Sequence, residues 1–256
     1  MYNYPFLDFN ALNNEMNNQG IKSSQKLSFM YEKMNGKFYD DEKNLMKGAV
    51  VGITAIGSFP VELSDTNKLM LLGHEVTIEQ VKEQLNKTIG MSAFMSYLNP
   101  KNKSLDSIAE TTLDLKHYSV LHTVNLSIAI VGLSSGVEHE FSSQRDIVHL
   151  SRLTVAKTKT QSNPCLVLRN YKYYDMYKEI LKNTKNLLEH IEEKDNETEN
   201  LLFPTAKASS IILTGSLKNI LKLISLKDAG GKEDEFIEIL EKIEGLVKEI
   251  YPELLN

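Results

Sequence analysis

The stretch that most constrains the fold of this chain covers residues 116–157 and joins a strand pattern to a dense polar segment. Within it, residues 123–131 alternate apolar side chains with small or polar ones. A two-residue period predicts a β-strand with one buried face. Four of the six histidines of the chain also lie in this stretch. If the protein carries out chemistry, we expect the residues for it here.

Small residues after this strand predict a turn over 132–136, in which Ser134 or Ser135 can cap a helix over 137–145. Apolar residues at three- and four-residue steps predict further helices. These segments are 76–85, 107–115, 171–193, 217–226 and 236–251. Residues 49–59 form a short apolar segment, and 147–155 fit a helix or a strand. The chain is therefore expected to be a helix-rich α+β protein.

The composition narrows the classes of function. The 256-residue chain has a net charge of −5, so no general attraction to nucleic acid or anionic membranes is expected. Its single cysteine, Cys165, excludes an internal disulfide and fits a reducing compartment. No apolar run reaches the roughly 18 residues that span a bilayer, and the first residues lack a secretory signal pattern. We expect a cytoplasmic protein with no nucleic-acid or membrane partner.

The common catalytic and metal-binding motifs do not occur. His117 and His122 are five positions apart, which misses the i, i+4 spacing that places two ligands on one helix face. His139 lacks the second histidine of a zinc-protease helix, and neither a Gly-x-Ser-x-Gly motif nor a glycine-rich phosphate loop is present. No metal site is expected. From pattern alone, residues 139–152 fit a ligand site and a solvated helix face equally.

Three segments of the central stretch carry a family resemblance: KHYSVLHTVNLSI, GLSS and HEFSSQR. They are similar to a stretch of the flavin-dependent thymidylate synthases that reads roughly G-H-x-S-V-x-E-H-x-x-F-x-F, then small and polar residues with S-R, then H-Q-x-x-R-H-R. No gap is needed between the first histidine and the last arginine. The residues on family positions are His117, Ser119, Val120, Ser134, His139 and Arg145.

Two further blocks agree with this family. AIGSF resembles its early A-R-x-S-F segment, which helps to hold the flavin. LFPTAKASSIILTGSLKNILKLISLKD resembles its L-P-(x)11-N-x-R-x-L-(x)5-L-R block: Pro204 matches, Ser216 and Lys218 stand at N-x-R, and Lys227 stands at the final arginine. Glu235 falls where the family has the glutamate of its next helix. The three blocks are in the right order and cover roughly half of the chain.

The chain departs from the family pattern at charged positions. R-H-R is Ser-Gln-Arg at residues 143–145, an arginine of the L-P block is Ser210, and the late arginine is Lys227. The lost arginines are the bidentate donors best suited to a phosphate. Glu140 replaces a glutamine and adds a negative charge where the family binds an anionic nucleotide. A 5′-phosphate would be repelled unless this carboxyl is protonated or points away.

The resemblance implies a central antiparallel sheet flanked by helices and a homotetramer with active sites between subunits. It also implies transfer of a one-carbon unit from methylene-tetrahydrofolate to C5 of dUMP, mediated by FAD and supplied with electrons by NADPH. By position, the cofactor-binding residues are Ser58, His117, Ser119, His122, Gln144, Arg145, Ser216 and Lys218. The substrate-binding residues are Glu140, Ser143, Ser151, Arg152 and Lys227, each with a solvated surface role as the alternative; Arg145 and Lys227 are the catalytic candidates.

The resemblance also divides the chain. Residues 1–47 are expected to form an N-terminal arm, and residues 48–256 a single flavin-dependent thymidylate synthase-like domain. An insertion at about residues 60–115 is longer than in typical members of the family. It could serve as a lid or as an added interface.

Three functions are compatible with the sequence. The first is a divergent flavin-dependent enzyme that alkylates C5 of a pyrimidine nucleotide or a related substrate. The second is a non-catalytic paralogue that keeps the fold for assembly or partner binding, which would explain the lost arginines. The third is a flavoenzyme with different redox chemistry, because a fold does not determine a reaction. Tight flavin retention favours the first function, and a flavin-free oligomer favours the second.

Overall fold

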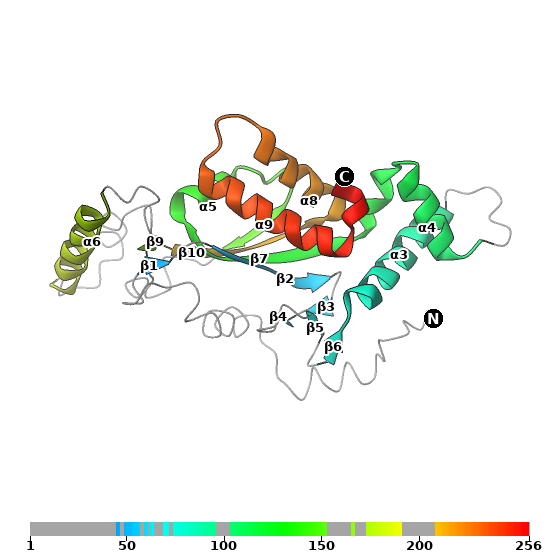
Figure 1. The fold of residues 1–256 in the computed structure, drawn as a ribbon, viewed down its shortest axis with the longest axis horizontal. Coiled ribbons are helices and arrows are strands. Elements are labelled where there is room, and N and C mark those ends of the chain that lie inside the picture. Colours follow the sequence, from blue (N-terminus) through cyan, green and yellow to red (C-terminus); the bar gives the residue numbers. More distant parts are fainter. Residues whose placement is uncertain are drawn as a thin grey trace.

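The computed structural model describes residues 45–46, 49–56, 59–60, 62–63, 69–71, 74–95, 103–152, 165–166, 173–190 and 208–255. Its centre is a five-stranded antiparallel sheet in the order β3-β2-β7-β10-β8 (Figure 1). The strands are β2 (Val50–Ile56), β3 (Phe59–Pro60), β7 (Asn125–Ser134), β8 (His149–Arg152) and β10 (Ala208–Ser216). The predicted α+β class with a central antiparallel sheet is confirmed.

Two smaller sheets accompany the central one. β1 (Leu45–Met46) pairs in parallel with β9 (Cys165–Leu166). β4 (Glu62–Leu63), β5 (Leu69–Leu71) and β6 (His74–Val76) form an antiparallel sheet. This second sheet belongs to the segment expected to be an insertion. The expected N-terminal arm lies outside the described residues, apart from β1.

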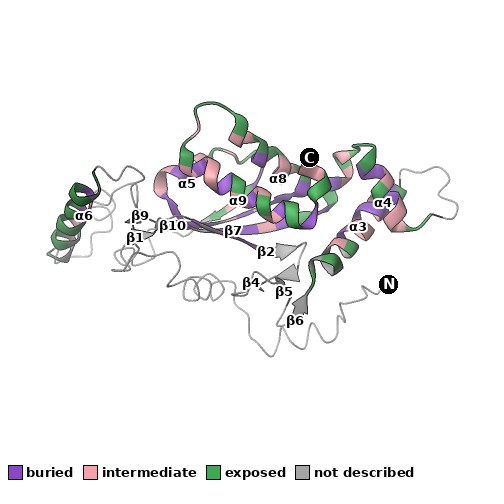
Figure 2. Ribbon diagram, in the orientation of Figure 1, coloured by how far each residue is buried: buried purple, intermediate pink, exposed green. Residues whose placement is uncertain are grey.

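Helices cover one face of the central sheet. α5 (Ser135–Ser142), α8 (Leu217–Ile224) and α9 (Asp234–Ile250) lie over the strands in Figure 1, and Figure 2 shows buried residues along each of them. The short 3-10 helix η5 (Ser225–Asp228) follows α8, and η6 (Pro252–Leu255) follows α9. The arrangement is a two-layer α+β structure.

The two central strands have the alternating pattern that the sequence of β7 predicted. Ile128 and Ile130 of β7 are fully buried, at 0 % exposure, and lie opposite Leu213 and Ile211 of β10. Ser127, on the other face of β7, is only half-buried. The buried face packs in one apolar cluster with α8 and α9. Full burial of each such side chain contributes about 1.5–3 kcal/mol, so this contact stabilises both layers.

The structure corrects one local prediction after β7 and confirms another. The turn expected over 132–136 is wrong at its start, because β7 continues to Ser134. Gly132 has φ +86° and lies at a β-bulge opposite Ser209 and Ser210, a backbone conformation that glycine adopts at no steric cost. Of the two predicted candidates, Ser134 is the N-cap of α5, since its Oγ accepts a hydrogen bond from the Val137 N–H at 3.2 Å.

α3 (Ile78–Phe94) and α4 (Leu105–Asp114) form a packed helix pair that leads into the 3-10 helix η1 (Tyr118–Thr123). Gly90 allows the close approach of the two helices. A Cβ added there would lie 2.1 Å from the Leu105 carbonyl oxygen and 2.7 Å from its carbonyl carbon. No side-chain carbon fits at that distance from backbone atoms, so glycine is required at this position.

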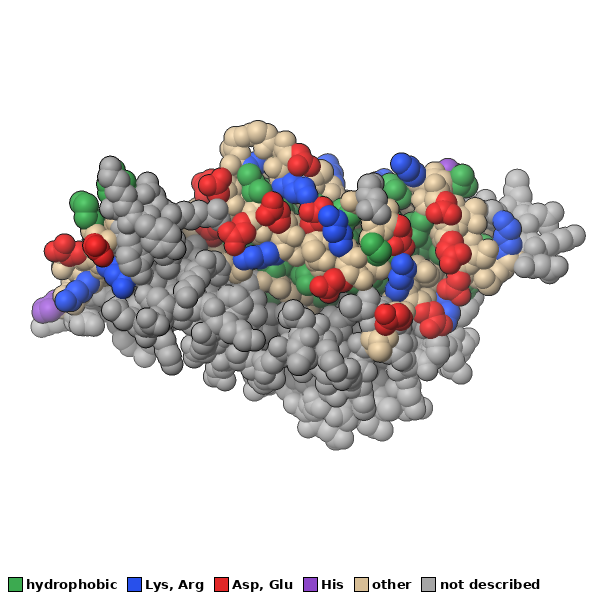
Figure 3. Space-filling view, viewed as in Figure 1, with side chains coloured by type: hydrophobic (Ala, Val, Ile, Leu, Met, Phe, Trp, Pro, Cys, Tyr) green, Lys and Arg blue, Asp and Glu red, His purple; other side chains and the backbone are tan. Residues whose placement is uncertain are grey.

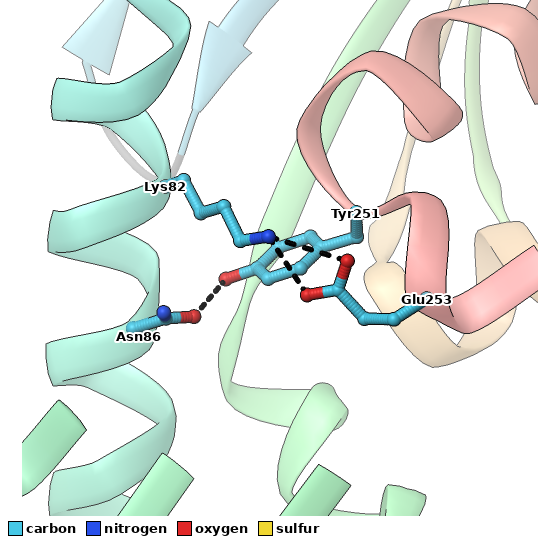
Figure 4. Close-up of polar contacts among 4 residues, drawn as sticks. All are labelled: Lys82, Asn86, Tyr251 and Glu253. Carbon is cyan, nitrogen blue, oxygen red and sulfur yellow. Dashed lines mark hydrogen bonds and ion pairs between the residues drawn. The ribbon is translucent and has the colours of Figure 1, made fainter. Parts of the chain in front are cut away.

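The end of the chain is fastened to α3 by Tyr251 (Figure 4). This side chain is buried, at 1 % exposure, and its hydroxyl donates a hydrogen bond to Asn86 Oδ1 at 3.1 Å. Lys82 pairs with Glu253 at 2.9 Å and lies 5.6 Å from the centre of the Tyr251 ring. Burial raises the pKa of Tyr251, and the charge of Glu253 raises that pKa further. These contacts join the end of α9 to the helix pair.

α6 (Tyr174–Glu189) is the amphipathic helix expected within residues 171–193. Figure 1 places it at the opposite end of the molecule from α3 and α4. Tyr177 and Leu181 are buried, whereas Met176 and Ile180 are exposed. One side of the apolar stripe of this helix is therefore buried, and the other side is exposed to solvent.

The viewed face of the helical layer is charged. Figure 3 shows Lys and Arg side chains interspersed with Asp and Glu side chains over it. On α9, Lys242 pairs with Glu238 at 2.8 Å and Lys248 with Glu244 at 3.1 Å, each one helical turn apart. This is the pattern of a solvated helix surface. Within the described residues, no helix has the length and apolar character required to cross a membrane.

We expect Gly90→Ala to destabilise the protein by about 1–3 kcal/mol, the usual range for an overpacked site, because the methyl group would force α3 away from α4. The matched control is Gly245→Ala in α9, where nothing lies within 4 Å of an added Cβ. Alanine is the better helix former, so this control should be neutral or up to about 1 kcal/mol more stable. Urea denaturation compares the two variants, and equal effects would contradict the close packing at Gly90.

We expect Tyr251→Phe to lower the free energy of unfolding by about 1 kcal/mol, because it removes the hydrogen bond to Asn86. The free energy of unfolding of this variant should also depend less on pH at high pH. In the unfolded chain a tyrosine ionises at about pH 10, whereas burial raises the pKa of Tyr251 in the folded protein. The stability linked to this group is therefore present below about pH 10 and lost as the pH rises further.

Denaturation of the wild type and of Tyr251→Phe at about pH 8 and about pH 11 measures this difference. Tyr173→Phe is the control, because the Tyr173 side chain is 49 % exposed. An equal pH dependence in all three proteins would contradict the assignment to Tyr251.

Candidate functional site

Residues from two separate sequence blocks meet where η1 approaches the start of α8. His122 Nδ1 lies 3.1 Å from Ser216 Oγ, although 94 positions separate these residues in the chain. Ser216 is the N-cap of α8 and is buried, and its Oγ also accepts a hydrogen bond from the Asn219 N–H at 3.3 Å. The cap satisfies a free N–H of the first helical turn. Its second contact holds the imidazole of His122, which stays exposed.

Three more predicted cofactor-binding residues lie on these two elements. His117 directly precedes η1, Ser119 lies within it and Lys218 lies in the first turn of α8; all three are exposed. Lys116 has φ +56°, in the left-handed region that favours glycine. The family pattern has a glycine at this place. Two histidines, a hydroxyl and an ammonium group are thus exposed on these two elements.

The end of α5 groups four further predicted residues. Ser143 closes the helix: its Oγ donates a hydrogen bond to the Glu140 carbonyl at 2.7 Å, and its N–H bonds to the His139 carbonyl at 3.1 Å. Gln144 Nε2 donates to Ser143 Oγ at 2.9 Å, and Arg145 is exposed in the turn that follows. The expectation that this helix reaches Arg145 is wrong, because these bonds end α5 at Ser142.

The turn after α5 returns to the end of β10 that carries Ser216. A Cβ added at Gly215 would lie 3.0 Å from Val148 Cγ1 and 3.6 Å from the Ile147 carbonyl oxygen. β8 then begins at His149, which pairs with Thr214. Gly215 therefore allows the segment after Arg145 to lie directly beside the cap of α8. The fold brings two sequence blocks that are far apart in the chain to one edge of the structure.

Glu140 has a cationic partner that the sequence did not indicate. Its carboxylate pairs with Lys232 Nζ at 2.8 Å, and the two side chains are 18 % and 22 % exposed. Lys232 Nζ also lies 5.4 Å from the centre of the Phe236 ring, which packs on Phe141 with 4.7 Å between ring centres. The negative charge of Glu140 is therefore offset within the same chain.

Two more carboxylates hold α5 in place. Glu235 Oε1 accepts a hydrogen bond from the Ser134 N–H at 2.7 Å, which joins the start of α9 to the start of α5. Glu138, which is buried, accepts a hydrogen bond from Ser209 Oγ at 2.5 Å. Glu235 was marked by its family position, whereas nothing in the sequence pattern pointed to Glu138 or Lys232. Their partners come from distant parts of the chain, so no local signal could reveal them.

Lys227, a predicted catalytic and substrate-binding residue, contacts α9. Its ammonium group forms an ion pair with Glu244, which also pairs with Lys248. The hydrogen bond that Lys227 donates to Glu244 raises the pKa of Lys227, and the same bond lowers the pKa of Glu244. Lys227 thus stays protonated and is held by a carboxylate in this conformation.

The remaining predicted residues are less fully described. Ser151 is exposed on β8, where it pairs with Ile212 of β10. The backbone of Arg152 pairs with Ile211, and its side chain lies outside the description. Ser58 lies outside the described residues. Across the described segments, no group of three or more His, Cys, Asp or Glu residues is arranged to hold a metal ion.

One buried hydroxyl beside the turn after α5 lacks a partner. Ser142 Oγ is buried and makes no hydrogen bond in the described part of the chain. Leaving a buried hydroxyl unpaired costs about 1–3 kcal/mol. The exposed guanidinium of Arg145 and the imidazoles of His117 and His122 add donors suited to an anionic, hydrogen-bonding ligand. Side chains of these kinds bind the phosphates of dinucleotide cofactors such as FAD.

The architecture defines an α+β protein in which the predicted site residues of two distant sequence blocks lie around η1, the end of α5 and the end of β10. The family model described as thymidylate synthase complementing protein matches residues 70–253. The chain belongs to the thymidylate synthase complementing protein family. No curated protein sequence matches it.

A solved structure also shares this fold. The flavin-dependent thymidylate synthase ThyX of Helicobacter pylori, complexed with FAD and dUMP, aligns with a TM-score of 0.52 and 16 % identity over 61 % of this chain and 86 % of that chain. A second structure of Helicobacter pylori ThyX with FAD and dUMP aligns with a TM-score of 0.49 and 16 % identity over 75 % of this chain and 90 % of that chain. At such identity the likeness of the first structure concerns the fold.

We expect Ser216→Ala to lower the free energy of unfolding by about 1 kcal/mol, the usual cost of losing an N-cap, and to release His122. Ser104→Ala is the matched control, because Ser104 caps α4 by accepting a hydrogen bond from the Ser107 N–H at 3.2 Å. Both variants should lose similar stability. Only Ser216→Ala should shift the imidazole NMR signals of His122, and unchanged signals would contradict this contact in solution.

Proposed function

We propose that this protein is a flavin-dependent thymidylate synthase-like enzyme that transfers a one-carbon unit from methylene-tetrahydrofolate to C5 of a pyrimidine nucleotide, with NADPH as electron donor. The observation that carries the proposal is the contact of His122 with Ser216 at 3.1 Å. It joins two sequence blocks that each resemble the cofactor-binding pattern of the family. Membership of that family and the FAD and dUMP bound by Helicobacter pylori ThyX support the same function.

In this proposal, Ser58, His117, Ser119 and His122 line the adenosine or phosphate side of FAD. Ser216 and Lys218 reach the flavin, and Gln144 binds the cofactor. Arg145 reaches the flavin as well, because its exposed guanidinium can donate paired hydrogen bonds to a phosphate or a ring carbonyl. When bound, FAD would supply the redox chemistry and the relay of the one-carbon unit.

The substrate side of the proposal uses the end of α5 and its surroundings. Glu140, Ser143, Ser151, Arg152 and Lys227 would surround the pyrimidine nucleotide, with Arg145 and Lys227 as the catalytic pair. Because Glu244 raises the pKa of Lys227, its ammonium can stabilise negative charge but cannot accept a proton at neutral pH. Lys227 must leave Glu244 to reach a substrate.

A homotetramer in the cytoplasm, with active sites between subunits, is part of the same proposal. The second candidate is a non-catalytic paralogue that keeps the fold for assembly or partner binding. The pairing of Lys227 with Glu244 favours it, because this cation already has a partner within the chain. Flavin content separates the two candidates.

We expect the purified protein to absorb at roughly 370 and 450 nm, as any oxidised flavin does, and to release FAD on heating. Arg145→Ala should lower the FAD occupancy several-fold with no loss of stability, because Arg145 is exposed. Lys222→Ala, which removes an exposed cation from the last turn of α8, should retain the wild-type occupancy. The absorbance ratio at 450 and 280 nm and a thermal melt measure both effects.

A colourless protein that also fails to bind added FAD would refute the enzymatic proposal and favour the non-catalytic paralogue. A yellow protein whose FAD content is unchanged in Arg145→Ala would remove Arg145 from the cofactor site and leave the enzymatic proposal in place.

A further inference from the structure

The loop before α9 carries a lysine that folds back onto α5. Gly231, with φ +81°, turns the backbone just before Lys232. The Nζ of Lys232 then reaches Glu140 at 2.8 Å, near the last turn of α5. A glycine in the left-handed region allows this reversal without strain. Loop geometry thus brings a cation to the carboxylate that stands where the family pattern has a neutral glutamine.

Two contacts hold the Lys232 side chain: the ion pair with Glu140 and the approach to the Phe236 ring. Its side chain is only 22 % exposed and its Nζ lies 5.4 Å from the centre of the Phe236 ring. Phe236 is itself fully buried against Phe141. A half-buried ion pair of this kind is costly to break from one side only, because the remaining charge keeps its desolvation penalty. Glu140 and Lys232 therefore act as one electrically neutral unit.

We infer that Lys232 is a specificity-determining residue: it neutralises Glu140, and the substrate site thereby accepts an anionic pyrimidine nucleotide in preference to the uncharged nucleoside. This inference rests on the proposed function, which puts Glu140 beside the substrate. The family pattern has a neutral glutamine at this position. Here the opposite charges of Glu140 and Lys232 cancel, so the net charge is also zero. The repulsion of a 5′-phosphate that Glu140 alone would cause is removed in this way.

The wild type, the two single variants Glu140→Gln and Lys232→Gln, and the double variant together separate the effect of the charges from the effect of packing. Glu140→Gln keeps the shape of the side chain and leaves Lys232 as an added positive charge. Lys232→Gln leaves Glu140 as an added negative charge, and the double variant is neutral again. A change of one unit of charge at the site acts on the dianionic phosphate of dUMP and leaves deoxyuridine largely unaffected.

The experiment measures dUMP and deoxyuridine binding by calorimetry at low salt, with each protein saturated with FAD. We expect Glu140→Gln to tighten dUMP binding by roughly three- to tenfold and Lys232→Gln to weaken it by roughly the same factor. The double variant should return to within about twofold of the wild type, since the two charges interact. Deoxyuridine affinity should stay within about twofold throughout.

Glu83→Gln is the matched control for net charge, because Glu83 pairs with Lys87 on α3 at 2.5 Å. It should leave the affinity for both ligands unchanged. The expected changes should also shrink at high salt, where screening weakens the attraction of a phosphate to a partly exposed charge.

If both single variants lose stability while dUMP affinity stays at the wild-type value, the pair only fastens α9 to α5, and the inference is overturned. It is also overturned if dUMP and deoxyuridine affinities change by the same factor. In both cases, wild-type binding of dUMP leaves the proposed function standing. A wild type that holds FAD but binds neither ligand would refute the proposed substrate and this inference together.

Discussion

The packing of α8 and α9 against the paired strands β7 and β10 is the contact on which the rest of the structure depends. Ile128 and Ile130 of β7 and Ile211 and Leu213 of β10 form the sheet side of this contact and are buried to within 1 % of complete. Each strand of the pair also begins or ends at an element of the candidate site. η1 leads into β7, α5 follows it, and α8 follows β10. Any shift between the two strands would therefore move the site residues relative to one another.

Two similar strand-to-helix junctions connect this sheet to the elements of the candidate site. Ser134 ends β7 and caps α5, and Ser216 ends β10 and caps α8, with nearly the same extended backbone conformation in both. In each case the hydroxyl accepts a hydrogen bond from the N–H three residues later. Each serine also has a partner from a distant segment, Glu235 for Ser134 and His122 for Ser216. A serine cap of the same kind thus begins both helices, and the cap of α8 also contacts His122, a predicted site residue.

The charged departures from the family pattern have different structural consequences. Glu140 forms an ion pair with Lys232, so the added negative charge near the end of α5 has a partner. Lys227, in place of an arginine, is held by Glu244 on α9. A point charge of this kind forms an ion pair but lacks the planar fork of a guanidinium that binds a phosphate with two parallel hydrogen bonds. Arg145 keeps that fork and is exposed. The site therefore offers fewer phosphate donors than the family pattern, and the one added negative charge, that of Glu140, is neutralised by Lys232.

The sequence by itself determined what depends on neighbouring residues. The two-residue alternation over 123–131 predicted β7, and the three- and four-residue steps predicted the amphipathic helices. The sequence also limited the cap of α5 to Ser134 or Ser135, since periodicity and capping are properties of a few consecutive residues. The resemblance assigned His122 and Ser216 to the cofactor by position only and did not indicate that they touch. Only the tertiary structure decided the bulge at Gly132, the end of α5 at Ser142, and the partners of Glu140, Glu138 and Lys227. These features depend on which distant segments pack together, and that choice is made by burial of the whole apolar core.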